Sequence, residues 1–491
     1  MTTARSTKVL ILTLGNGLNV LINFLTLPYL VRSLSYVEYG SYGQVLLLVG
    51  IIQGIFSFNL NQVANIFFSD ERYRAPDVFA TLTRLTILLG IGGMLFMYLL
   101  SPVFVYLFDN RLLDRLVFLS LLNLFAQIPI PIFMAVLVYW GKVKSMTMIL
   151  VLSNIVKVIA MLIAIQLYHS LDLLMMALSV VSILQMVAFY LSIPATIRRN
   201  GGFQSDMSRR FFKLASPLAI SSLIERSLFY IDGMVISSLL GTTAFALYRA
   251  GAIEVPFIAT LYGAVATIVM PEVARSFAER NYSEIIRLKR VAISTTVFMV
   301  YPVLLFLLFF SGPLVSAYLS QKYVESVLVF SIFNLSLFIR VNDFQDVIIV
   351  SGNGRYIFFS VAFTTVLNLL LNYILISGFG IAGGAASFII SLFVFAGLLT
   401  RKSLQIMKCR FVDLVDIKLI GKILLVSAAL ACALFLIYTF LLPYLAFIII
   451  VAPLYAATVF LIGVKWKLAD ERLLNFVLMK VKTLLRFKVW A

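Results

Sequence analysis

Cysteine and histidine are almost absent from this chain of 491 residues. Cys409 and Cys432 are its only cysteines, and His169 is its only histidine. A disulfide framework requires several cysteines, and a metal site built from Cys and His requires several such ligands. The sequence therefore argues against both kinds of site, and we expect no metal ion and no cofactor.

Charged residues are also scarce, at 12% of the chain, whereas hydrophobic residues make up 62%. This composition is typical of proteins that cross a membrane many times. A spanning helix takes about 20 residues, and none of the apolar segments shows the alternation expected of an outer-membrane barrel. We predict an all-α polytopic membrane protein with about 14 transmembrane helices, near residues 9–31, 42–67, 82–107, 116–138, 146–168, 173–196, 214–240, 246–270, 291–311, 327–350, 357–376, 381–399, 422–441 and 444–464.

The net charge of +18 would suit a nucleic-acid partner, but its distribution favours another explanation. Most of the 39 Lys and Arg residues lie in the two terminal segments and in the loops after even-numbered spans. The loops on the other side hold only Arg32, Arg111, Arg115 and Lys322. Because cytoplasmic loops carry an excess of Lys and Arg, we expect both termini in the cytoplasm and no nucleic-acid partner.

Several charges nevertheless fall within the predicted spans, where each costs roughly 2.5–3.5 kcal/mol at the bilayer centre. The stretch from Lys213 to Ile268, which the sequence predicts to be two helices joined by a short turn, concentrates them. Such residues must face one another, water or a charged cargo, so we expect this stretch to line a transport cavity. The charged residues in the spans are the acids Glu225, Asp232, Glu254, Asp343 and Asp346 and the bases Lys157, Arg226, Arg249 and Arg340.

Two explanations remain open for most of these polar residues. Asn16, Asn19 and Asn23 share one face of the first span, where amides either join helices or bind sugars; Gln44 and Gln53 in the second span pose the same choice. Lys157 either pairs with an acid or binds a phosphate. Arg340 and Asp343 are three residues apart and can pair within one helix.

The two halves of the chain resemble each other weakly. Leu34, Gly40 and Tyr42 match Leu240, Ala246 and Tyr248 at an offset of 206, and Ser120–Leu124 matches Ser331–Leu335 at an offset of 211. Six spans per copy preserve the orientation, so the repeats are parallel. The predicted organisation is an N-terminal lobe at 1–200, a cytoplasmic linker at 201–213, a C-terminal lobe at 214–402, two further helices at 403–464 and a basic amphipathic tail at 465–491 on the inner leaflet.

A family resemblance rests on the turns between the first and second spans of each copy. The first turn has the pattern LxxxEYGxY, made of Leu34, Glu38, Tyr39, Gly40 and Tyr42. The second follows the run YIDGMVISSLLG, from Tyr230 to Gly241, and includes Tyr248. Both resemble elements of the Wzx-like polysaccharide and O-antigen flippases, a branch of the multidrug/oligosaccharidyl-lipid/polysaccharide exporter superfamily. The resemblance covers roughly residues 1–400, although Ser35 and Ala246 replace two glycines of the pattern.

This resemblance implies a V-shaped pair of six-helix lobes with two additional C-terminal helices. It implies a monomer in the bacterial inner membrane that is not an enzyme and has no catalytic residues. Its cargo would be an undecaprenyl-diphosphate-linked oligosaccharide for lipopolysaccharide O-antigen, moved from the cytoplasmic to the periplasmic leaflet by alternating access. Membrane lipid and the polysaccharide polymerase machinery would be its other partners.

The cargo chemistry suggests roles for the candidate residues. Cations suit a diphosphate and amides suit sugars, so the substrate-binding candidates are Arg226, Arg249, Arg340, Lys157, Asn16, Asn19, Asn23 and Gln53. Carboxylates within spans can bind H⁺ or Na⁺ and couple transport to an ion gradient. The ion-coupling candidates are Glu225, Asp232, Glu254 and Asp343.

Three rival functions remain. A drug/cation antiporter or a lipid II flippase of the same superfamily would share the fold. The antiporter branch often has an acid in its first helix, and none lies between Lys8 and Val31. A membrane glycosyltransferase or polymerase would act on the same lipid-linked sugar, but the longest outer loop, Gly312–Ser326, is short for such an enzyme.

Overall fold

The computed structural model describes residues 2–58, 60–253, 255–342, 345–440 and 445–465. These residues are almost entirely helical, and no strand occurs among them. Ten of the described helices are long and apolar enough to cross a membrane. The predicted class, an all-α polytopic membrane protein, is confirmed.

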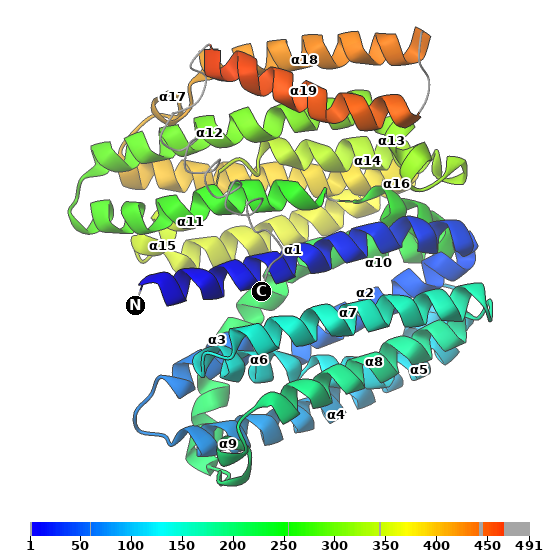
Figure 1. Cartoon of the computed structure of the whole chain (residues 1–491), viewed down its shortest axis with the longest axis vertical. Helices are drawn as coiled ribbons and strands as arrows, with labels where there is room; N and C mark the ends of the chain where they lie inside the picture. The colour runs from blue at the N-terminus through cyan, green and yellow to red at the C-terminus, as the bar shows by residue number, and fades with distance from the viewer. Residues whose placement is uncertain (1, 59, 254, 343–344, 441–444, 466–491) are drawn as a thin grey trace. The chain divides into compact units, whose positions relative to one another are not determined.

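The chain divides into two compact units, drawn together in Figure 1. Unit 1 comprises Met1–Ala250 with Leu371–Gly384, and unit 2 comprises Gly251–Leu370 with Ala385–Ala491. The lobes at 1–200 and 214–402 stay a prediction from the repeat. The helices of unit 1 are α1 (Thr2–Ser33), α2 (Tyr36–Phe56), α3 (Leu60–Phe68), α4 (Ala75–Leu107), α5 (Leu112–Gln127), α6 (Ile130–Tyr139), α7 (Val143–Gln166), α8 (Leu171–Ser192), α9 (Ala195–Arg199) and α10 (Ser205–Gly251).

Unit 2 contains the remaining helices, and the middle of its longest helix, α16, belongs to unit 1. Gly241 in α10 and Gly380 in α16 have φ values of 82° and 59°, which interrupt the two helices. Glycine adopts such values without a steric penalty. The elements of unit 2 are α11 (Pro256–Ala278), α12 (Tyr282–Phe309), α13 (Ser311–Tyr318), η1 (Gln321–Tyr323), α14 (Ser326–Asn334), η2 (Leu335–Phe338), α15 (Gln345–Val350), α16 (Gly354–Met407), α17 (Phe411–Leu414), α18 (Ile417–Phe440) and α19 (Leu445–Lys465).

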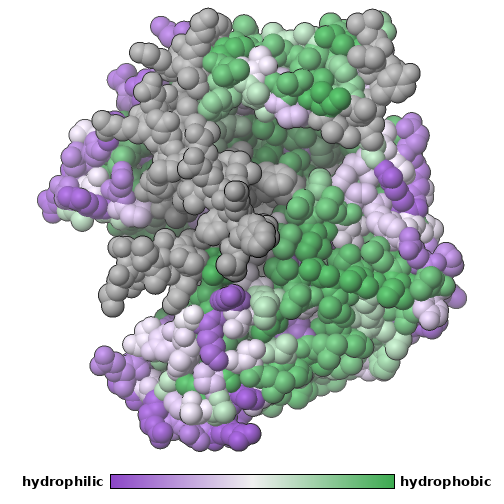
Figure 2. Space-filling view, in the orientation of Figure 1, coloured by the Kyte–Doolittle hydropathy of each residue, from purple (hydrophilic) through white to green (hydrophobic). Residues whose placement is uncertain are grey.

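The outer surface of unit 1 suits contact with lipid. Figure 2 shows apolar residues over the middle of α7 and α8, with hydrophilic residues gathered at the two ends of these helices. Leu152, Ile159 and Leu184 are among the exposed apolar side chains. Such an extensive exposed apolar surface is expected of a protein whose solvent is a bilayer.

The predicted turn between α1 and α2 is fixed by a capping box. The Ser35 hydroxyl accepts a hydrogen bond from the Glu38 backbone N–H at 3.2 Å, and the Glu38 carboxylate accepts one from the Ser35 N–H at 2.8 Å. Gly241 occupies the equivalent position of the second copy, 206 residues later. Ser35 therefore begins α2 by satisfying free backbone groups, whereas Gly241 turns the chain through its positive φ.

Close approach of α2 to α10 requires a glycine. A Cβ at Gly40 would lie 2.4 Å from the Thr242 carbonyl oxygen. No Cβ fits at that distance from a backbone atom. The backbones of the two repeat-related turns are therefore in direct contact inside unit 1.

The predicted span at 246–270 is wrong as a single helix. Helix α10 ends at Gly251 and α11 begins at Pro256. Proline has no N–H and clashes with the carbonyl four residues earlier, but it is favoured in the first turn of a helix. Pro256 therefore begins a new helix inside the predicted span.

The fourth span of each copy is broken at the same place. Helix α5 ends at Gln127 and α6 begins at Ile130, as the prolines at 129 and 131 lead one to expect. In the second copy η2 ends at Phe338, which is 211 residues after Gln127, and α15 begins only at Gln345. The predicted continuous span at 327–350 is therefore wrong.

Side chains satisfy the backbone at both breaks. Pro131 has no N–H to offer the Gln127 carbonyl, which instead accepts a hydrogen bond from Gln53 Nε2 at 3.3 Å. The Phe338 carbonyl accepts one from the Tyr301 hydroxyl at 3.0 Å. Breaks at membrane depth are tolerated where a neighbouring group replaces the lost backbone bond.

Helices α18 and α19 pack on α12 through aromatic side chains. Phe310 contacts Phe306 and Phe435 with ring centroids 4.6 and 5.5 Å apart. The buried Tyr455 hydroxyl donates to the carbonyls of Pro302 and Ser427 at 3.0 and 3.1 Å. These last two helices are thus integral to the core of unit 2. The tail predicted at 465–491 lies, apart from Lys465, outside the described residues.

The predicted linker at 201–213 is attached to α4 by hydrogen bonds at its first residues. Helix α10 begins at Ser205, so only 201–204 of the predicted linker are non-helical. The Gly202 N–H donates to the Asp77 carboxylate at 2.7 Å, and the Gln204 N–H donates to the Thr81 hydroxyl at 3.0 Å. These two bonds attach the segment to the beginning of α4.

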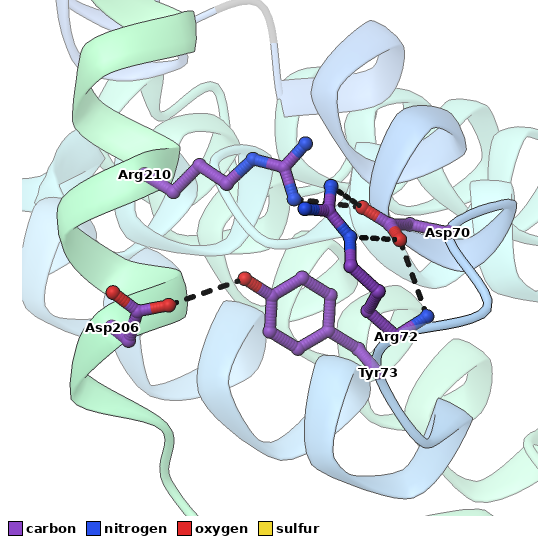
Figure 3. A network of polar contacts seen from close by, with 5 residues as sticks. All are labelled: Asp70, Arg72, Tyr73, Asp206 and Arg210. Carbon is purple, nitrogen blue, oxygen red and sulfur yellow. Dashed lines mark hydrogen bonds and ion pairs between the residues drawn. The ribbon is translucent and has the colours of Figure 1, made fainter.

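A polar cluster adds a second attachment, between the α3–α4 loop and the first turns of α10 (Figure 3). Asp70 accepts hydrogen bonds from Arg72 Nη2 and Arg210 Nη1, both at 2.7 Å. The Tyr73 hydroxyl lies 3.5 Å from the Asp206 carboxylate, and the Arg210 guanidinium lies over the Tyr73 ring. We call these five residues the Asp70 clasp.

The charge on Asp70 holds the clasp together. Hydrogen bonds from Arg72 and then Arg210 hold the pKa of the Asp70 carboxyl well below its usual range. A carboxyl with a lowered folded pKa stabilises the fold above its unfolded pKa of about 4, and this contribution is lost as the pH falls through the folded value. The clasp is therefore fully formed at neutral pH.

We expect Asp70→Asn to open the clasp at neutral pH, because the amide cannot hold two guanidinium groups. Hydrogen–deuterium exchange of peptides covering 69–75 and 200–210, corrected for intrinsic rates, should be faster than in the unchanged chain. Glu279→Gln removes the exposed Arg275–Glu279 pair and is the matched control, with no change expected in these peptides. Unaltered protection in Asp70→Asn would contradict an anchoring role.

Candidate functional site

A polar stripe runs along α1 and α7 in unit 1. A Cβ at Gly15 would overlap the Thr147 side chain, so the two helices approach closely. Further along both helices Asn154 Nδ2 donates to the Asn19 carbonyl at 3.4 Å. The predicted face of asparagines is thus present: Asn16 and Asn23 are exposed, whereas Asn19 is half-buried with its side-chain oxygen unpartnered among the described residues.

Lys157 extends this stripe. The contacts of Gly15 with Thr147 and of Asn19 with Asn154 show that α1 and α7 run parallel, so one turn further Lys157 lies level with Asn23. The lysine is half-buried and makes no ion pair or hydrogen bond with any residue that the structure describes. Of the two explanations open for Lys157, pairing with an acid therefore finds no support among the described residues.

Arg249 lies beside the turn between α1 and α2. Its Nη1 donates to the Gly43 carbonyl at 3.1 Å, and its guanidinium lies over the Tyr42 ring at 5.8 Å. A hydrogen bond also links it to Tyr39. These contacts join the two repeat-related turns of unit 1, and a role for Arg249 in cargo binding stays a prediction.

The glutamines of α2 have structural partners. Gln53 caps the Gln127 carbonyl, as described above. Gln44 is fully buried, accepts a hydrogen bond from Asn110 Nδ2 at 2.8 Å and lies 3.3 Å from the Thr242 hydroxyl. For Gln44 and Gln53 the interhelical explanation therefore has direct support, and sugar binding by Gln53 stays a prediction.

Asp232 is the one ion-coupling candidate whose side chain is described. It is 2% exposed and accepts hydrogen bonds from the Tyr248 hydroxyl at 3.3 Å and from Asn372 Nδ2 at 2.6 Å. Both donors are neutral. A carboxylate buried within a membrane span is a candidate for binding a proton or a cation.

The other three acids and one cation cannot be placed. Glu254 and Asp343 lie outside the described residues, as do the side chains of Glu225 and Arg226. The predicted helical pairing of Arg340 with Asp343 is therefore not described. The chain leaves the helical conformation after Phe338, so Arg340 itself lies outside a helix.

Unit 2 contains a cavity at the break between η2 and α15, which we call the polar cavity after the charged and amide side chains within its largely apolar lining. It has a volume of about 580 Å³ and is bordered by α11, α12 and α16. Arg340, Asn342 and Gln345 line it together with Lys289 and Asp346. Irregular backbone at membrane depth commonly borders such a cavity.

Lys289 and Asp346 form a buried ion pair in this cavity. The Lys289 Nζ lies 2.6 Å from the Asp346 carboxylate and 3.2 Å from Asn342 Oδ1, and the two charged side chains are 2% and 7% exposed. Sequence reasoning missed this pair, because Lys289 lies between Arg287 and Arg290, and such basic clusters are typical of cytoplasmic loops. Its spacing from the apolar Ile285 and Ala292, four and three residues away on one helix face, is the signal that would have placed it inside.

Comparison with known proteins agrees with these features. The family model described as polysaccharide biosynthesis protein matches residues 6–277, more than half of the chain. The chain belongs to the polysaccharide biosynthesis protein family. The capsular polysaccharide biosynthesis protein CapF of Staphylococcus aureus is 21% identical over 388 residues, which cover 77% of this chain and 94% of CapF.

Two solved structures show which fold this family member has. The lipid II flippase MurJ in its inward closed conformation is 16% identical, covers 94% of this chain and 99% of its own, and superposes with a TM-score of 0.75. An inward-facing multidrug resistance MATE family transporter of the MOP superfamily is 14% identical, covers 81% and 94%, and gives 0.60. The resemblance inferred from the two repeated turns is confirmed, and the family match assigns the chain to polysaccharide biosynthesis.

We expect Lys289→Met to destabilise this polysaccharide biosynthesis family member strongly, because Asp346 would be left buried without its cation. Breaking one partner of a buried pair costs about 3–5 kcal/mol, whereas apolar replacement of both is close to neutral. Lys289→Met/Asp346→Leu should therefore recover most of the loss. Thermal unfolding can be followed through a thiol-reactive dye, since Cys409 and Cys432 are free and half-buried.

Lys418→Met, at an exposed position, is the control for this pair. Equal unfolding temperatures for Lys289→Met and the unchanged protein would show that the pair contributes nothing. A double variant no more stable than the single one would show that Lys289 acts through other contacts.

Proposed function

We propose that this protein is a flippase for an undecaprenyl-diphosphate-linked oligosaccharide, moving it from the cytoplasmic to the periplasmic leaflet by alternating access. The observation that carries this proposal is the polar stripe of α1 and α7 in a member of the polysaccharide biosynthesis family. It combines exposed amides with one lysine that has no described partner.

The chemistry of the stripe matches the head of such a cargo. Asn16 and Asn23 offer both donors and acceptors, which is what sugar hydroxyls require. Lys157 supplies a compact positive charge of the kind that binds phosphates. A cation inside a span is retained only where it has a function or a partner, and a diphosphate would be that partner.

The proposal places the protein in the bacterial inner membrane as a non-enzymatic monomer with cytoplasmic termini. The one-sided distribution of Lys and Arg supports this orientation. CapF, the relative from Staphylococcus aureus, is named for capsular polysaccharide. We therefore favour a capsule-type cargo over the expected lipopolysaccharide O-antigen, with the polysaccharide polymerase machinery as the step that follows.

Asp232 supports coupling to an H⁺ or Na⁺ gradient. Its side chain is buried within a predicted span, and carboxylates in such positions are typical of ion-binding and proton-relay sites in transporters. The transported ion would be a second cargo of the protein.

The first experiment locates the lipid-linked oligosaccharide in cells that lack this protein. A sugar-modifying probe that cannot cross the membrane should fail to reach it in intact cells, and surface polysaccharide should be lost. Normal surface polysaccharide with altered drug sensitivity would indicate a drug/cation antiporter. Accumulation of lipid II would indicate a lipid II flippase, and accumulation of unextended precursor outside would indicate a polymerase.

We expect Lys157→Ala to reduce transport by about 10- to 100-fold, because a hydrogen bond to a charged group contributes about 1.5–3 kcal/mol. Uptake of a labelled polyprenyl-diphosphate sugar into the inner leaflet of proteoliposomes measures this rate. Lys144→Ala, an exposed lysine of the same helix, is the matched control and should transport normally. Wild-type rates for Lys157→Ala would remove the lysine from the cargo site.

We expect Asp232→Asn to uncouple transport from the ion gradient, since the amide keeps the shape of the side chain but binds no proton or Na⁺. Rates in proteoliposomes should then be the same with and without an imposed H⁺ or Na⁺ gradient. Asp114→Asn, at an exposed position of α5, should retain any gradient dependence of the unchanged protein. Gradient-driven transport by Asp232→Asn would rule out this carboxylate as the coupling site.

A further inference from the structure

A second, larger cavity lies in unit 2 beside the polar one. Its volume is about 930 Å³, near the upper end of the range of about 300–1,000 Å³ that is usual for small-molecule sites. Helices α12, α16, α17 and α18 form it with the segment after η2, at the end of the unit where α16 finishes and α18 begins. Most of its lining side chains are apolar.

The apolar lining continues onto the outer surface of the unit. Phe393, Phe411 and Ile417 all border the cavity, and they are 46%, 47% and 59% exposed. In a membrane protein such surface contacts lipid chains. An alkyl chain can therefore enter the cavity from the bilayer without crossing a polar barrier.

Two cations stand at the rim. Arg401 and Lys408 border the cavity and are exposed, and neither side chain makes a hydrogen bond or ion pair with any residue that the structure describes. They are seven residues apart, Arg401 within the last two turns of α16 and Lys408 directly after its final residue, Met407. Both are therefore free to bind one anionic group placed over the mouth of the cavity.

The backbone at Lys408 is unusual. This residue ends α16 with φ 54° and ψ 41°, a left-handed conformation in which glycine is the usual residue. A side chain there carries a steric penalty. The chain nevertheless has a lysine at this position, directly beside the apolar cavity.

We propose that this cavity binds an anionic phospholipid, with an acyl chain among the apolar side chains and the headgroup phosphate on Arg401 and Lys408. Charge decides between this occupant and the protein's own tail, because residues 466–491 carry more Lys and Arg than Asp and Glu. A basic segment would meet the two cations unfavourably, whereas a phosphate would neutralise them. The site does not depend on the proposed flippase activity.

The test is native mass spectrometry of the full chain in detergent, titrated with phosphatidylglycerol or phosphatidylethanolamine of identical acyl chains. We expect one phosphatidylglycerol to bind more tightly than phosphatidylethanolamine. Arg401→Gln/Lys408→Gln should weaken phosphatidylglycerol binding by about tenfold or more, since each cation near an anionic lipid contributes about 1 kcal/mol. Lys418→Gln/Lys422→Gln removes two exposed cations at the same end of the unit, outside the cavity lining, and should bind as the unchanged protein does.

A second pair of variants tests whether the acyl chain binds among the apolar side chains of the cavity. A Cβ at Gly397, which lines the cavity, meets no atom within 4 Å, so Gly397→Phe can fill the space without a clash at Cβ. It should weaken binding of both lipids. Gly421→Phe, which also enters open space but lies outside the cavity lining, should weaken neither.

A third measurement requires no change to the site. Cys409 borders the cavity and Cys432 does not. In a Cys432→Ser background, phosphatidylglycerol should slow maleimide labelling of Cys409, and phosphatidylethanolamine should slow it less.

Several outcomes would overturn the proposal. Equal affinity of the unchanged protein and Arg401→Gln/Lys408→Gln for phosphatidylglycerol is one, and equal losses in the Lys418→Gln/Lys422→Gln control are another. Retention of a polyprenyl phosphate in place of phospholipid would make the cavity part of the cargo path. Phospholipid binding that begins only after removal of 466–491 would show that the tail fills the cavity.

Discussion

The structure depends throughout on one constraint: in a lipid environment each backbone carbonyl and N–H must find its partner within the protein. The two broken spans show how this is met. Gln53 provides the hydrogen bond that Pro131 cannot give to Gln127, and Tyr301 does the same for Phe338. The breaks fall at repeat-equivalent positions, yet side chains from unrelated positions of the chain cap them. Both copies therefore need a hydrogen-bond donor for a free carbonyl at the break, but each copy takes that donor from a different position.

The same constraint separates structural charges from functional ones. Lys289 is neutralised by Asp346 inside unit 2, and Arg249 is held by a carbonyl and an aromatic ring in unit 1. Both side chains therefore have partners within the fold. Lys157 has no such compensation among the described residues, although it lies in the middle of a membrane-spanning helix. An uncompensated cation in that environment favours an anionic partner from outside the fold.

Much of the fold and of the family could be predicted from the sequence, because both depend on strong regularities. Long apolar runs, a one-sided distribution of basic residues and two repeated turns require no knowledge of packing. The broken spans at Pro256 and after Phe338 were missed for opposite reasons. Pro256 lies inside a predicted span although it begins a helix, and the segment after Phe338 contains no proline that would mark the break.

The candidate site was harder to predict, since the role of a polar side chain depends on which neighbour lies opposite. Gln44 and Gln53 look like the asparagines of α1 in sequence, but the first two bond to the protein and Asn16 and Asn23 are exposed. Lys289 looked like a loop cation because the residues next to it are basic. Only its partner, Asp346 on another helix, distinguishes Lys289 from the basic residues beside it.

The non-helical segment after Phe338 lies between the two cavities of unit 2. Ile339, Val341 and Asn342 line both the polar cavity and the larger apolar one, so this non-helical segment is the wall between them. A helix at this position would have bonded its own backbone and kept a fixed shape. A short irregular segment held by the Tyr301 hydroxyl has fewer internal bonds, and its position depends on what fills the space on either side. Occupation of the apolar cavity therefore has a direct physical route to Arg340 and Lys289, through a wall that contacts both.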